Sequence, residues 1–570
     1  MPTSRRSFLK SAGVTGAGML ALGQTSAQVR DASAAGGPDS SAVMTELFLD
    51  NELLEATPGV SRRLHPPRKH LLNPVVRCDR WCDGNNIQPY TTMYDEEDRL
   101  FKMWARAGSD WQNGRVEDNA AYMLYFTSQD GIHWDKPDLG VMEVAGRRDH
   151  NIVFTSDHVP RSPTAHAYGP EKFVVPTSPM VPQGKKAFFW GVNKHPHPRD
   201  ASEKFIALAI VQDHRRGAHI VTSPDGIHWS CATSPFWQTP HDVSGTGDDC
   251  LMHLIYDDAK QKWALYRRVI PEFSERMIAD ESDCDRARAD RYYRSYAYAQ
   301  SEDLREWTNH QFILSMDADD APDTELYQFG CHKIGGTYVG FMSVFYHRRP
   351  KPIDVQLATS RDGIRFTRVC RGTPFIPHGP LGYYDFMAMG CSQPKPIVVN
   401  DTVYFYYAAL NFPHDVDMAR SDPTVLTSGA ALATCKRDRY ASLETSHLDP
   451  GPCRVLTRPF TVGQSRLYVN AAAWDQGGIR VEALTPDWQP IPGFTAAEAL
   501  EIRGDALDHA VQWKDHADVS RLVGQQVRLK FHMTRARLYA MTLTNETRQP
   551  GEVDAEDRHH QVREAAPTIT

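Results

Sequence analysis

Ser128-Gln-Asp-Gly-Ile-His-Trp134 is a short phrase that returns along the chain, and its repetition decides the fold. Asp-Gly between two apolar runs favours a tight hairpin, because glycine reaches positive φ without a steric penalty. The aromatic residue that closes the phrase can bury a large apolar face between neighbouring sheets. A supersecondary unit repeated in this way indicates a propeller or a solenoid. The further copies are Ser223-Pro-Asp-Gly-Ile-His-Trp229, Ser301-Glu-Asp-Leu-Arg-Glu-Trp307, Ser360-Arg-Asp-Gly-Ile-Arg-Phe366 and a weaker one, Cys435-Lys-Arg-Asp-Arg-Tyr440.

Each copy follows a short run of residues that favour β-strands, and a second hairpin stands upstream in most units. In the first unit these runs are Tyr90-Thr-Thr-Met-Tyr94, Leu100-Phe-Lys-Met-Trp104 and Met123-Leu-Tyr-Phe-Thr127. Two hairpins give four strands per unit, which is the content of one propeller blade. No part of this region shows helical periodicity. The sequence therefore predicts an all-β chain built on a five-bladed β-propeller. A pair of ordinary antiparallel sandwiches is the alternative.

The pattern changes beyond the last copy of the phrase. Alternating runs such as Leu467-Tyr-Val-Asn-Ala471 and Ile479-Arg-Val-Glu-Ala-Leu484 predict a small C-terminal β-sandwich. We place the propeller at residues 61–455 and the sandwich at 464–545. The remaining divisions are a linker over 28–60 and a polar tail over 546–570.

The N-terminus reads as an export signal. Thr3-Ser-Arg-Arg-Ser-Phe-Leu-Lys10 has the twin-arginine pattern, a weakly apolar stretch follows, and the small residues Thr25-Ser-Ala27 offer a cleavage site. We expect residues 1–27 to be a signal peptide that engages the twin-arginine translocase. The mature protein is then expected in a bacterial periplasm or outside the cell, with no membrane attachment.

Composition excludes some classes of partner. The chain of 570 residues has a formal net charge of −8 and no basic stripe, which argues against nucleic acid. The ten cysteines suggest no disulfide framework. Cys78 and Cys82 lack a second Cys/His pair at zinc spacing, so we expect buried thiols and no metal site. A disulfide is the alternative in an oxidising compartment.

Carboxylates stand just ahead of the first hairpin in four of the units. Because the innermost strands of a propeller line its axial funnel, such acids can meet there although they are far apart in sequence. Glycoside hydrolysis needs one protonated carboxyl to assist the leaving oxygen and one carboxylate to attack the sugar or activate water. For any single acid, a turn cap or a surface charge is the simpler explanation. The candidate catalytic residues are Asp249, Glu325, Asp385 and Asp83, with Asp248 as an alternative to its neighbour.

Aromatic and basic residues near these acids are candidates for substrate binding. Sugars present C–H faces that stack on aromatic rings, which suggests Trp81, Tyr327 and Tyr384. Two basic clusters end strands of the third and fourth units, and either could hold a carboxylate or a sulfated or uronic sugar. A solvated strand end is the plainer explanation for both clusters. From them we select Arg268 and His347.

Several of these stretches resemble a known group of enzymes. Asn73-Pro-Val-Val76, the run from Tyr94 to Trp104 and the run from Thr127 to Gly140 are similar to exported bacterial proteins grouped with the invertase-like and arabinanase-like glycoside hydrolases. The resemblance implies a five-bladed propeller with three acids in the axial funnel. It also implies roles: Glu325 as general acid, Asp249 as stabiliser, and Asp385 or Asp83 as base or nucleophile. The Asn-Asp-Pro of invertases is absent, and Ile87-Gln-Pro-Tyr90 stands near its place.

The predicted function is therefore an exported glycoside hydrolase that acts on an oligo- or polysaccharide. A non-catalytic glycan-binding propeller is one alternative. A transglycosylase or phosphorylase on the same scaffold is another, because propellers host many functions. We expect no cofactor. A structural calcium ion near the axis is an option, since clustered acids attract hard cations.

Overall fold

In the residues that it describes, the computed structural model consists mainly of β-strands and the turns between them. The described ranges contain strands, two 3-10 turns at Ala201–Glu203 and Ser520–Leu522, and no α-helix, which confirms the all-β class. Within them, no helix has the length and apolar character to cross a membrane. The described residues are 43–84, 86–107, 122–144, 146–155, 187–211, 218–231, 253–269, 294–321, 323–346, 352–390, 396–399, 401–413, 428–446 and 453–551.

The first three sheets each have four antiparallel strands in sequence order. Sheet 1 contains β6 (Ile87–Asp95), β7 (Leu100–Ala107), β8 (Tyr122–Ser128) and β9 (Ile152–Phe154). Sheet 2 contains β10 (Ala187–Lys194), β11 (Phe205–Val211), β12 (Ala218–Ser223) and β13 (Ser230–Cys231). Sheet 3 contains β14 (His253–Asp257), β15 (Lys262–Val269), β16 (Ser295–Ser301) and β17 (Thr308–Leu314).

Two further sheets are joined by one parallel bridge between Ile353 and Ala388. Sheet 4 contains β18 (Thr324–Ile334), β19 (Thr337–Tyr346), β20 (Ile353–Ser360) and β21 (Thr367–Val369). Sheet 5 contains β22 (Ala388–Gly390), β23 (Ile397–Val399), β24 (Thr402–Leu410) and β25 (Ser428–Lys436). Its outer edge is completed by two N-terminal strands that pair with β25, namely β4 (Arg68–Lys69) and β5 (Val76–Arg77).

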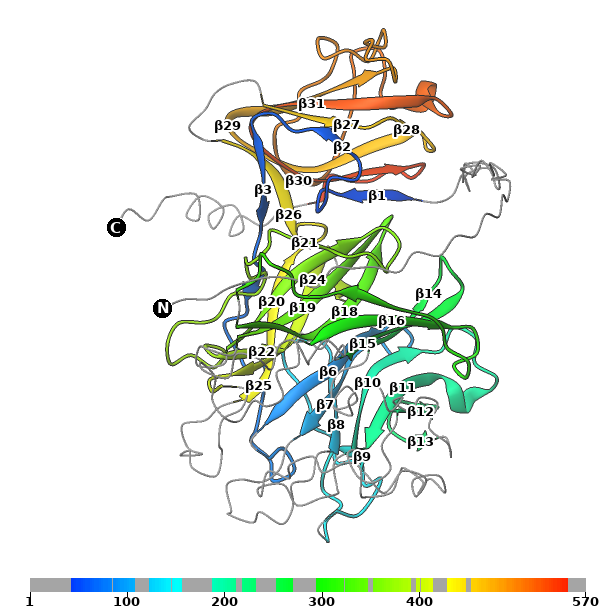
Figure 1. Cartoon of the computed structure of the whole chain (residues 1–570), viewed down its shortest axis with the longest axis vertical. Coiled ribbons are helices and arrows are strands. Elements are labelled where there is room, and N and C mark those ends of the chain that lie inside the picture. Colours follow the sequence, from blue (N-terminus) through cyan, green and yellow to red (C-terminus); the bar gives the residue numbers. More distant parts are fainter. Residues whose placement is uncertain are drawn as a thin grey trace, which may run out of the picture. The chain divides into compact units, whose positions relative to one another are not determined.

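The five sheets follow one another around a ring. β10 packs against β6 and β14, β18 packs against β14 and β15, and β6 packs against β24 and β25. The fifth sheet therefore meets the first, and Figure 1 shows these sheets in colours from blue to yellow. This order of contacts supports propeller architecture. The count of five blades stays our interpretation of it.

The repeated phrase folds into a turn held by its own side chains. In the first copy, the hydroxyl of Ser128 accepts a hydrogen bond from the backbone N–H of Gly131 at 2.9 Å. The carboxylate of Asp130 accepts from the N–H groups of Ile132 and His133, both at 2.8 Å. The same bonds recur in the copies that begin at Ser223, Ser301 and Ser360. We call the end of each sheet that carries this turn the repeat end.

Aromatic side chains link these turns to the preceding sheet. Trp104 Nε1 of sheet 1 donates to the carbonyl of Gly226 in sheet 2 at 2.7 Å. The hydroxyl of Tyr406 in sheet 5 donates to the carbonyl of Gly131 in sheet 1 at 2.6 Å, so the last sheet is bonded to the first. Tyr266 of sheet 3 makes the same bond to Gly363 of sheet 4 at 2.9 Å.

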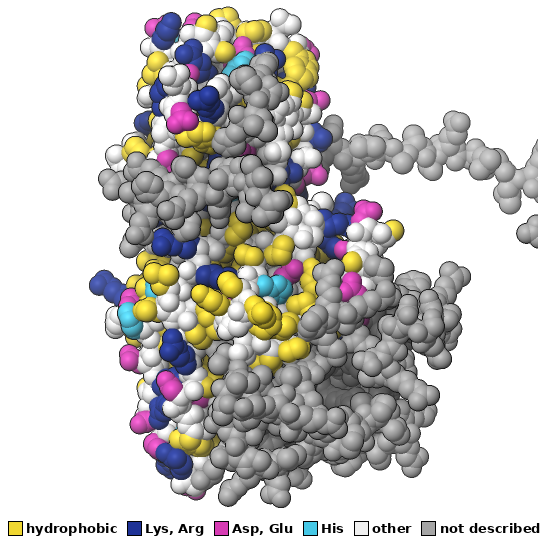
Figure 2. Space-filling model, turned by 90° about the vertical axis from the view of Figure 1, so that its left-hand side faces the viewer, with side chains coloured by type: hydrophobic (Ala, Val, Ile, Leu, Met, Phe, Trp, Pro, Cys, Tyr) yellow, Lys and Arg dark blue, Asp and Glu magenta, His cyan; other side chains and the backbone are white. Residues whose placement is uncertain are grey.

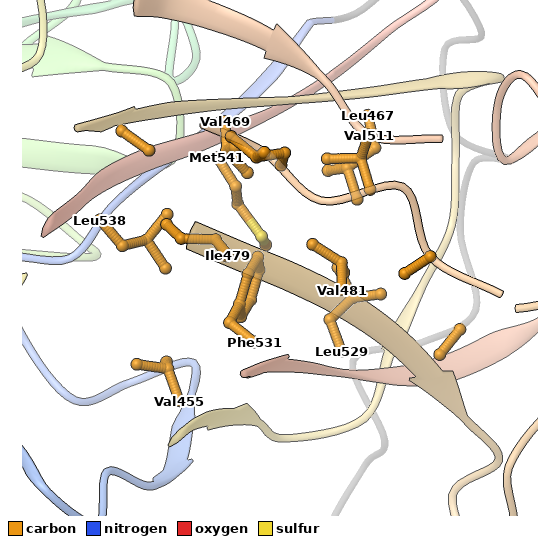
Figure 3. Close-up of a cluster of buried hydrophobic side chains, with 14 of the residues drawn as sticks. Val455, Leu467, Val469, Ile479, Val481, Val511, Leu529, Phe531, Leu538 and Met541 are labelled. Carbon is orange, nitrogen blue, oxygen red and sulfur yellow. The ribbon is translucent and has the colours of Figure 1, made fainter. Parts of the chain in front are cut away.

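The C-terminal part forms a nine-stranded sheet around one long antiparallel pair. β29 (Arg466–Leu484) and β31 (Gln526–Thr544) make that pair. Figure 3 shows Ile479, Phe531 and Met541 pointing toward one another in the core of this part. The other strands from this part of the chain are β26 (Ala441–Thr445), β27 (Cys453–Thr457), β28 (Phe460–Thr461) and β30 (Gly504–Ala510).

Three N-terminal strands complete this sheet, which corrects two sequence-based boundaries. β1 (Met44–Leu47) pairs with β31, β2 (Leu54–Ala56) with β27, and β3 (Val60–Leu64) with β26. Figure 1 shows them in blue among the yellow and orange strands. The expected linker over 28–60 thus contains strands, and the expected propeller boundary at 455 falls inside β27. That the sheet folds as a sandwich stays a prediction.

The C-terminal sheet contacts sheets 4 and 5 at their repeat ends. Arg361, in the turn of sheet 4, donates to both carboxylate oxygens of Glu46 at 2.7 and 2.5 Å and to Asp50 at 3.0 and 2.6 Å. Arg437, which follows sheet 5, donates to Asp508 at 2.6 Å. This contact leaves the opposite ends of the two sheets away from the C-terminal sheet.

The described surface mixes both signs of charge. Figure 2 shows Lys and Arg side chains interspersed with Asp and Glu side chains on one face, with hydrophobic side chains grouped near its middle. The most exposed large hydrophobic residues include Leu71 at 88% and Leu381 at 85%. On the described part of this face, no large area carries a single sign of charge.

Candidate active site

The strongest cluster of predicted site residues lies between sheets 3 and 4, at the ends opposite to their repeat ends. Because neighbouring strands are antiparallel, the end of β15 lies beside the starts of β14 and β16. Arg268 is the penultimate residue of β15, and Arg294 directly precedes β16. Glu325 is the second residue of β18, which packs against both β15 and β16. Three strands from two sheets therefore bring these side chains together.

Glu325 is held by an arginine that sequence reasoning missed. Glu325 is 6% exposed, and its Oε2 forms an ion pair with Nη1 of Arg294. The Arg294 guanidinium lies over the rings of Tyr327 and Phe345, 5.5 and 6.0 Å from their centroids. Such cation–π contacts orient the guanidinium as well as stabilise it. The sequence offers one hint: Arg294 is the last of four arginines in the stretch 286–294 and stands directly ahead of the strand run Ser295-Tyr-Ala-Tyr-Ala299.

Arg268 and Tyr327, both predicted to bind substrate, belong to the same cluster. The Arg268 guanidinium lies 5.2 Å from the centroid of the Tyr327 ring, so two guanidinium groups share that ring. Arg268 is buried, with 2% of its surface exposed, whereas the Arg294 side chain keeps 26%. The cluster thus joins a carboxylate, two cations and an aromatic ring, and solvent reaches it through Arg294.

A bulge in β18 positions Tyr327. Leu326 pairs with Val344 and Gln328 pairs with the next residue, Ser343, so Tyr327 is the extra residue of the bulge. Bulges bend a strand and re-aim its side chains. The hydroxyl of Tyr296 donates to the carbonyl of Gln328 at 2.7 Å and fixes the backbone behind it. No pattern in the sequence predicts this bulge.

His253 lies on β14 opposite Tyr266 and is fully buried. Burial lowers its pKa to about 3, so the imidazole is neutral at physiological pH. Neither ring nitrogen has a hydrogen-bond partner among the described residues.

Asp249, its alternative Asp248, and His347 all lie outside the described residues. Their roles stay predictions.

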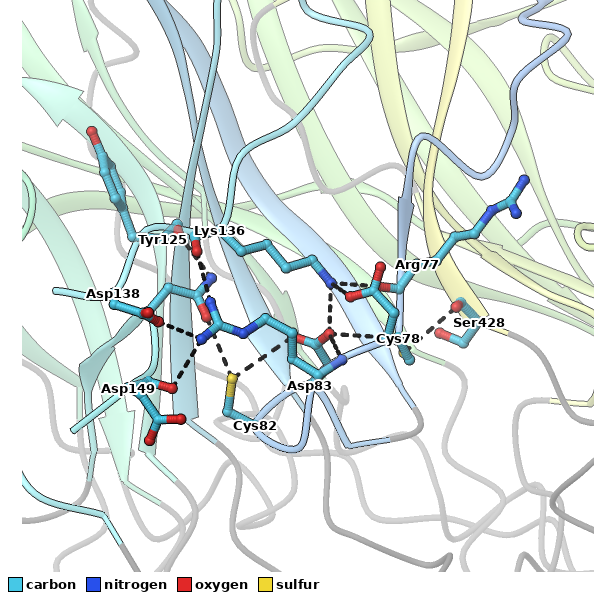
Figure 4. A network of polar contacts seen from close by, with 12 residues as sticks. Arg77, Cys78, Cys82, Asp83, Tyr125, Lys136, Asp138, Asp149 and Ser428 are labelled. Atoms are coloured by element: carbon cyan, nitrogen blue, oxygen red, sulfur yellow. Dashed lines mark hydrogen bonds and ion pairs between the residues drawn. The ribbon is translucent and has the colours of Figure 1, made fainter. Parts of the chain in front are cut away.

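Asp83 is buried in a turn ahead of sheet 1. One carboxylate oxygen accepts hydrogen bonds from the backbone N–H groups of Asp79 and Arg80 at 3.0 and 2.8 Å. The same oxygen forms an ion pair with Lys136 Nζ at 2.6 Å, as Figure 4 shows. Trp81, in the same turn, lies under the guanidinium of Arg147 at 4.7 Å. These contacts are those of a turn cap.

Asp385 is buried beside sheet 5. Its Oδ2 pairs with Lys69 Nζ on β4 at 2.5 Å and accepts from the hydroxyl of Tyr407 on β24 at 2.9 Å. Burial, followed by the charge of Asp385, raises the pKa of Tyr407 well above its usual value. A side chain at Gly379 would bring a Cβ within 2.2 Å of Oδ1, so only glycine fits there. Tyr384 accepts a hydrogen bond from Asn73 at 2.9 Å.

The structure brings some of the predicted residues into one cluster, and the others have their own sets of partners. Glu325, Arg268 and Tyr327 share one cluster with Arg294. Asp83 bonds to Asp79, Arg80 and Lys136. Asp385 bonds to Lys69 on β4 and to Tyr407 on β24. These two sets have no residue in common. Catalytic roles for Asp83 and Asp385 stay predictions.

The described residues suggest no metal centre. No group of three or more His, Cys, Asp or Glu side chains among them could hold a metal ion. Cys78 and Cys82 are free thiols. Burial raises the pKa of Cys78 to about 12, which keeps this thiol protonated and unreactive.

Comparison with known proteins finds likeness only among solved structures, because no family model and no curated protein sequence matches the chain. A family 43 arabinoxylan arabinofuranohydrolase from Bacillus subtilis, in complex with cellotetraose, is 13% identical with a TM-score of 0.37, over 84% of this chain and 99% of its own. A fructofuranosidase from Schwanniomyces occidentalis is 11% identical with a TM-score of 0.38, over 83% and 98%.

A β-1,2-mannobiose phosphorylase from Listeria innocua is likewise 11% identical with a TM-score of 0.38, over 65% of this chain and 96% of its own. The solved structures that the chain resembles therefore include glycoside hydrolases and a phosphorylase. At these identities and TM-scores the likeness assigns no activity to the site, whose chemistry we derive from its own residues.

Proposed function

We propose that the protein is a glycoside hydrolase that cleaves a glycosidic bond of an oligo- or polysaccharide at the Glu325 cluster. The observation that carries the proposal is the convergence of Glu325, Arg268 and Arg294 around Tyr327 at the start of β18. A positioned carboxyl group supplies proton transfer or nucleophilic attack in this chemistry. The guanidinium groups are donors suited to sugar hydroxyls and to charge that develops near the scissile bond.

The second carboxylate of the reaction is proposed to be Asp249. It stands just upstream of β14, which packs against β18. Asp83 and Asp385, in contrast, are paired with Lys136 and Lys69, and we assign both pairs to the support of the fold. We further propose that residues 1–27 direct export through the twin-arginine translocase, so that the enzyme works in the periplasm or outside the cell.

Substituting Glu325→Gln tests the proposal. The variant keeps the shape of the side chain but can neither carry nor accept the catalytic proton. We expect turnover of the responsive glycan to fall by about two to four orders of magnitude. The assay measures reducing ends released from a panel of plant and algal polysaccharides by the full-length protein.

Glu444→Gln is the matched control. Glu444 is a buried glutamate paired with an arginine, Arg537, in the C-terminal sheet. It should lose comparable stability while its turnover per folded molecule stays within about twofold of wild type, as for independent sites. Full activity of the folded Glu325→Gln variant would remove Glu325 from the reaction.

A phosphorylase is the second candidate, and the paired guanidinium groups of Arg268 and Arg294 favour it. Arginine binds phosphate oxygens through two parallel hydrogen bonds. If phosphate is the nucleophile, bond cleavage should require inorganic phosphate and yield a sugar phosphate. Cleavage that proceeds at the same rate without phosphate would exclude this candidate.

A further inference from the structure

We infer that Arg294 is a positioning residue that holds Glu325 as a carboxylate, so that Glu325 serves as base or nucleophile and not as the proton donor. The inference rests on the proposed function, and it reverses the role of general acid that the family resemblance implies for Glu325. Its starting point is the ion pair between Nη1 of Arg294 and Oε2 of Glu325. An ion pair requires the ionised carboxylate, whereas a general acid must enter the reaction with a proton.

Packing makes this ion pair persistent. An ion pair on the protein surface contributes little stability, because two mobile side chains must be ordered in water. Here the side chains of Glu325 and Arg294 are only 7% and 26% exposed. The guanidinium also contacts the rings of Tyr327 and Phe345. Arg294 is therefore held where its charge acts on Glu325, and it loses little further entropy when it pairs.

Among the described residues, charged and titratable groups near Glu325 come from strands that pack against β18. Arg268 on β15 and Arg294 ahead of β16 lie at the Tyr327 ring of β18, and the Tyr296 hydroxyl of β16 bonds to the Gln328 carbonyl. The neighbouring acids that the structure describes are Asp323, directly before β18, and Asp354 on β20, while the proposed second carboxylate, Asp249, lies outside the described residues. Asp354 is engaged by Gln356 at 3.1 Å and, through its other oxygen, by the hydroxyl of Tyr346 on β19 at 2.9 Å.

The cations in this set favour the charged form of Glu325. Cations within a few ångströms stabilise a carboxylate, and a partly dry site strengthens that effect. As a proton donor, Glu325 would first have to break its pair with Arg294. As a base or nucleophile, Glu325 can act while it stays paired with Arg294.

The pH dependence of kcat/KM for Arg294→Ala tests this role, because the two roles predict shifts of different limbs. If Glu325 must be ionised, activity is lost as the pH falls through its protonation. Removing Arg294 then moves the acid limb upward by about 1–3 pH units. Activity at the alkaline plateau should largely return. Arg294→Lys keeps a cation and should move the acid limb by less than half as much.

Arg371→Ala is the control for a general effect of losing an arginine. Arg371 pairs with Asp317 and is 34% exposed, close to the exposure of Arg294. Its profile should match that of wild type. Thermal unfolding of all three variants at each pH separates loss of fold from loss of chemistry.

Two results overturn the inference and leave the proposed function standing. One is an Arg294→Ala profile with both limbs unmoved. The other is a higher activity at neutral pH together with an upward shift of the alkaline limb, which identifies Glu325 as the proton donor. Failure of the proposed function is a separate result, namely full turnover by the folded Glu325→Gln variant.

Discussion

Asp385 is a candidate catalytic acid whose observed contacts join two strands of the fold. Its carboxylate is fully buried and joins Lys69 to Tyr407. Asp385→Asn removes the charge that both donors face, and a charged hydrogen bond is worth about 1.5–3 kcal/mol. We expect urea unfolding to show a loss of about 2 kcal/mol. In the control Asp138→Asn, where the aspartate side chain is 59% exposed, the change should stay within about 0.5 kcal/mol. Unchanged stability of Asp385→Asn together with lost turnover would instead assign Asp385 to catalysis.

The contacts of the candidate acids explain how much of the site could be predicted from the sequence. Acids that open the first strand of a unit are visible in the sequence, and Glu325 was found in that way. The rule cannot tell which acids face the axis, since that depends on contacts such as Lys136 with Asp83 and Lys69 with Asp385. Arg294 was missed because an ion-pair partner is set by the packing of two sheets. No local sequence pattern identifies Arg294 and Glu325 as partners.

At the scale of elements, three of the repeated turns accept a hydrogen bond from an aromatic side chain of the preceding sheet. Tyr406→Phe removes the hydroxyl that donates to Gly131 and so links sheet 5 to sheet 1. The carbonyl of Gly131 keeps a second donor, Trp134 Nε1 at 3.2 Å, so we expect a loss of about 1 kcal/mol in unfolding free energy. Tyr125→Phe is the control, because the Tyr125 hydroxyl bonds to no described residue. Equal stability of the two variants would show that the bond across the closure contributes nothing.

Strand content was predictable from local sequence, whereas strand pairing was not. The Ser-x-Asp-Gly phrase predicts its turn because serine and aspartate bond to backbone groups within the same few residues. By contrast, β4 and β5 complete sheet 5, and β1 to β3 join the C-terminal sheet, through partners hundreds of residues away. Pairing at that range leaves no periodic trace in a short segment, so residues 44–60 read as a linker.

At the scale of the whole molecule, the C-terminal sheet and the proposed catalytic cluster lie at opposite ends of sheet 4. The C-terminal sheet contacts sheets 4 and 5 at their repeat ends through residues such as Arg361. The Glu325 cluster lies at the opposite end of sheet 4. The C-terminal sheet therefore supports the ring of sheets and contributes no described residue to the Glu325 cluster. We accordingly expect catalytic effects from substitutions around β15, β16 and β18, and stability effects from those around Arg361.

The most direct test of the account is the mass of the products formed from the responsive polysaccharide in heavy-oxygen water with phosphate present. Hydrolysis predicts that each new reducing end carries one heavy oxygen atom, and that the label disappears along with the products in Glu325→Gln. Unlabelled sugar phosphates, or tight binding of the glycan with no new ends at all, would contradict the assignment of the protein as a hydrolase.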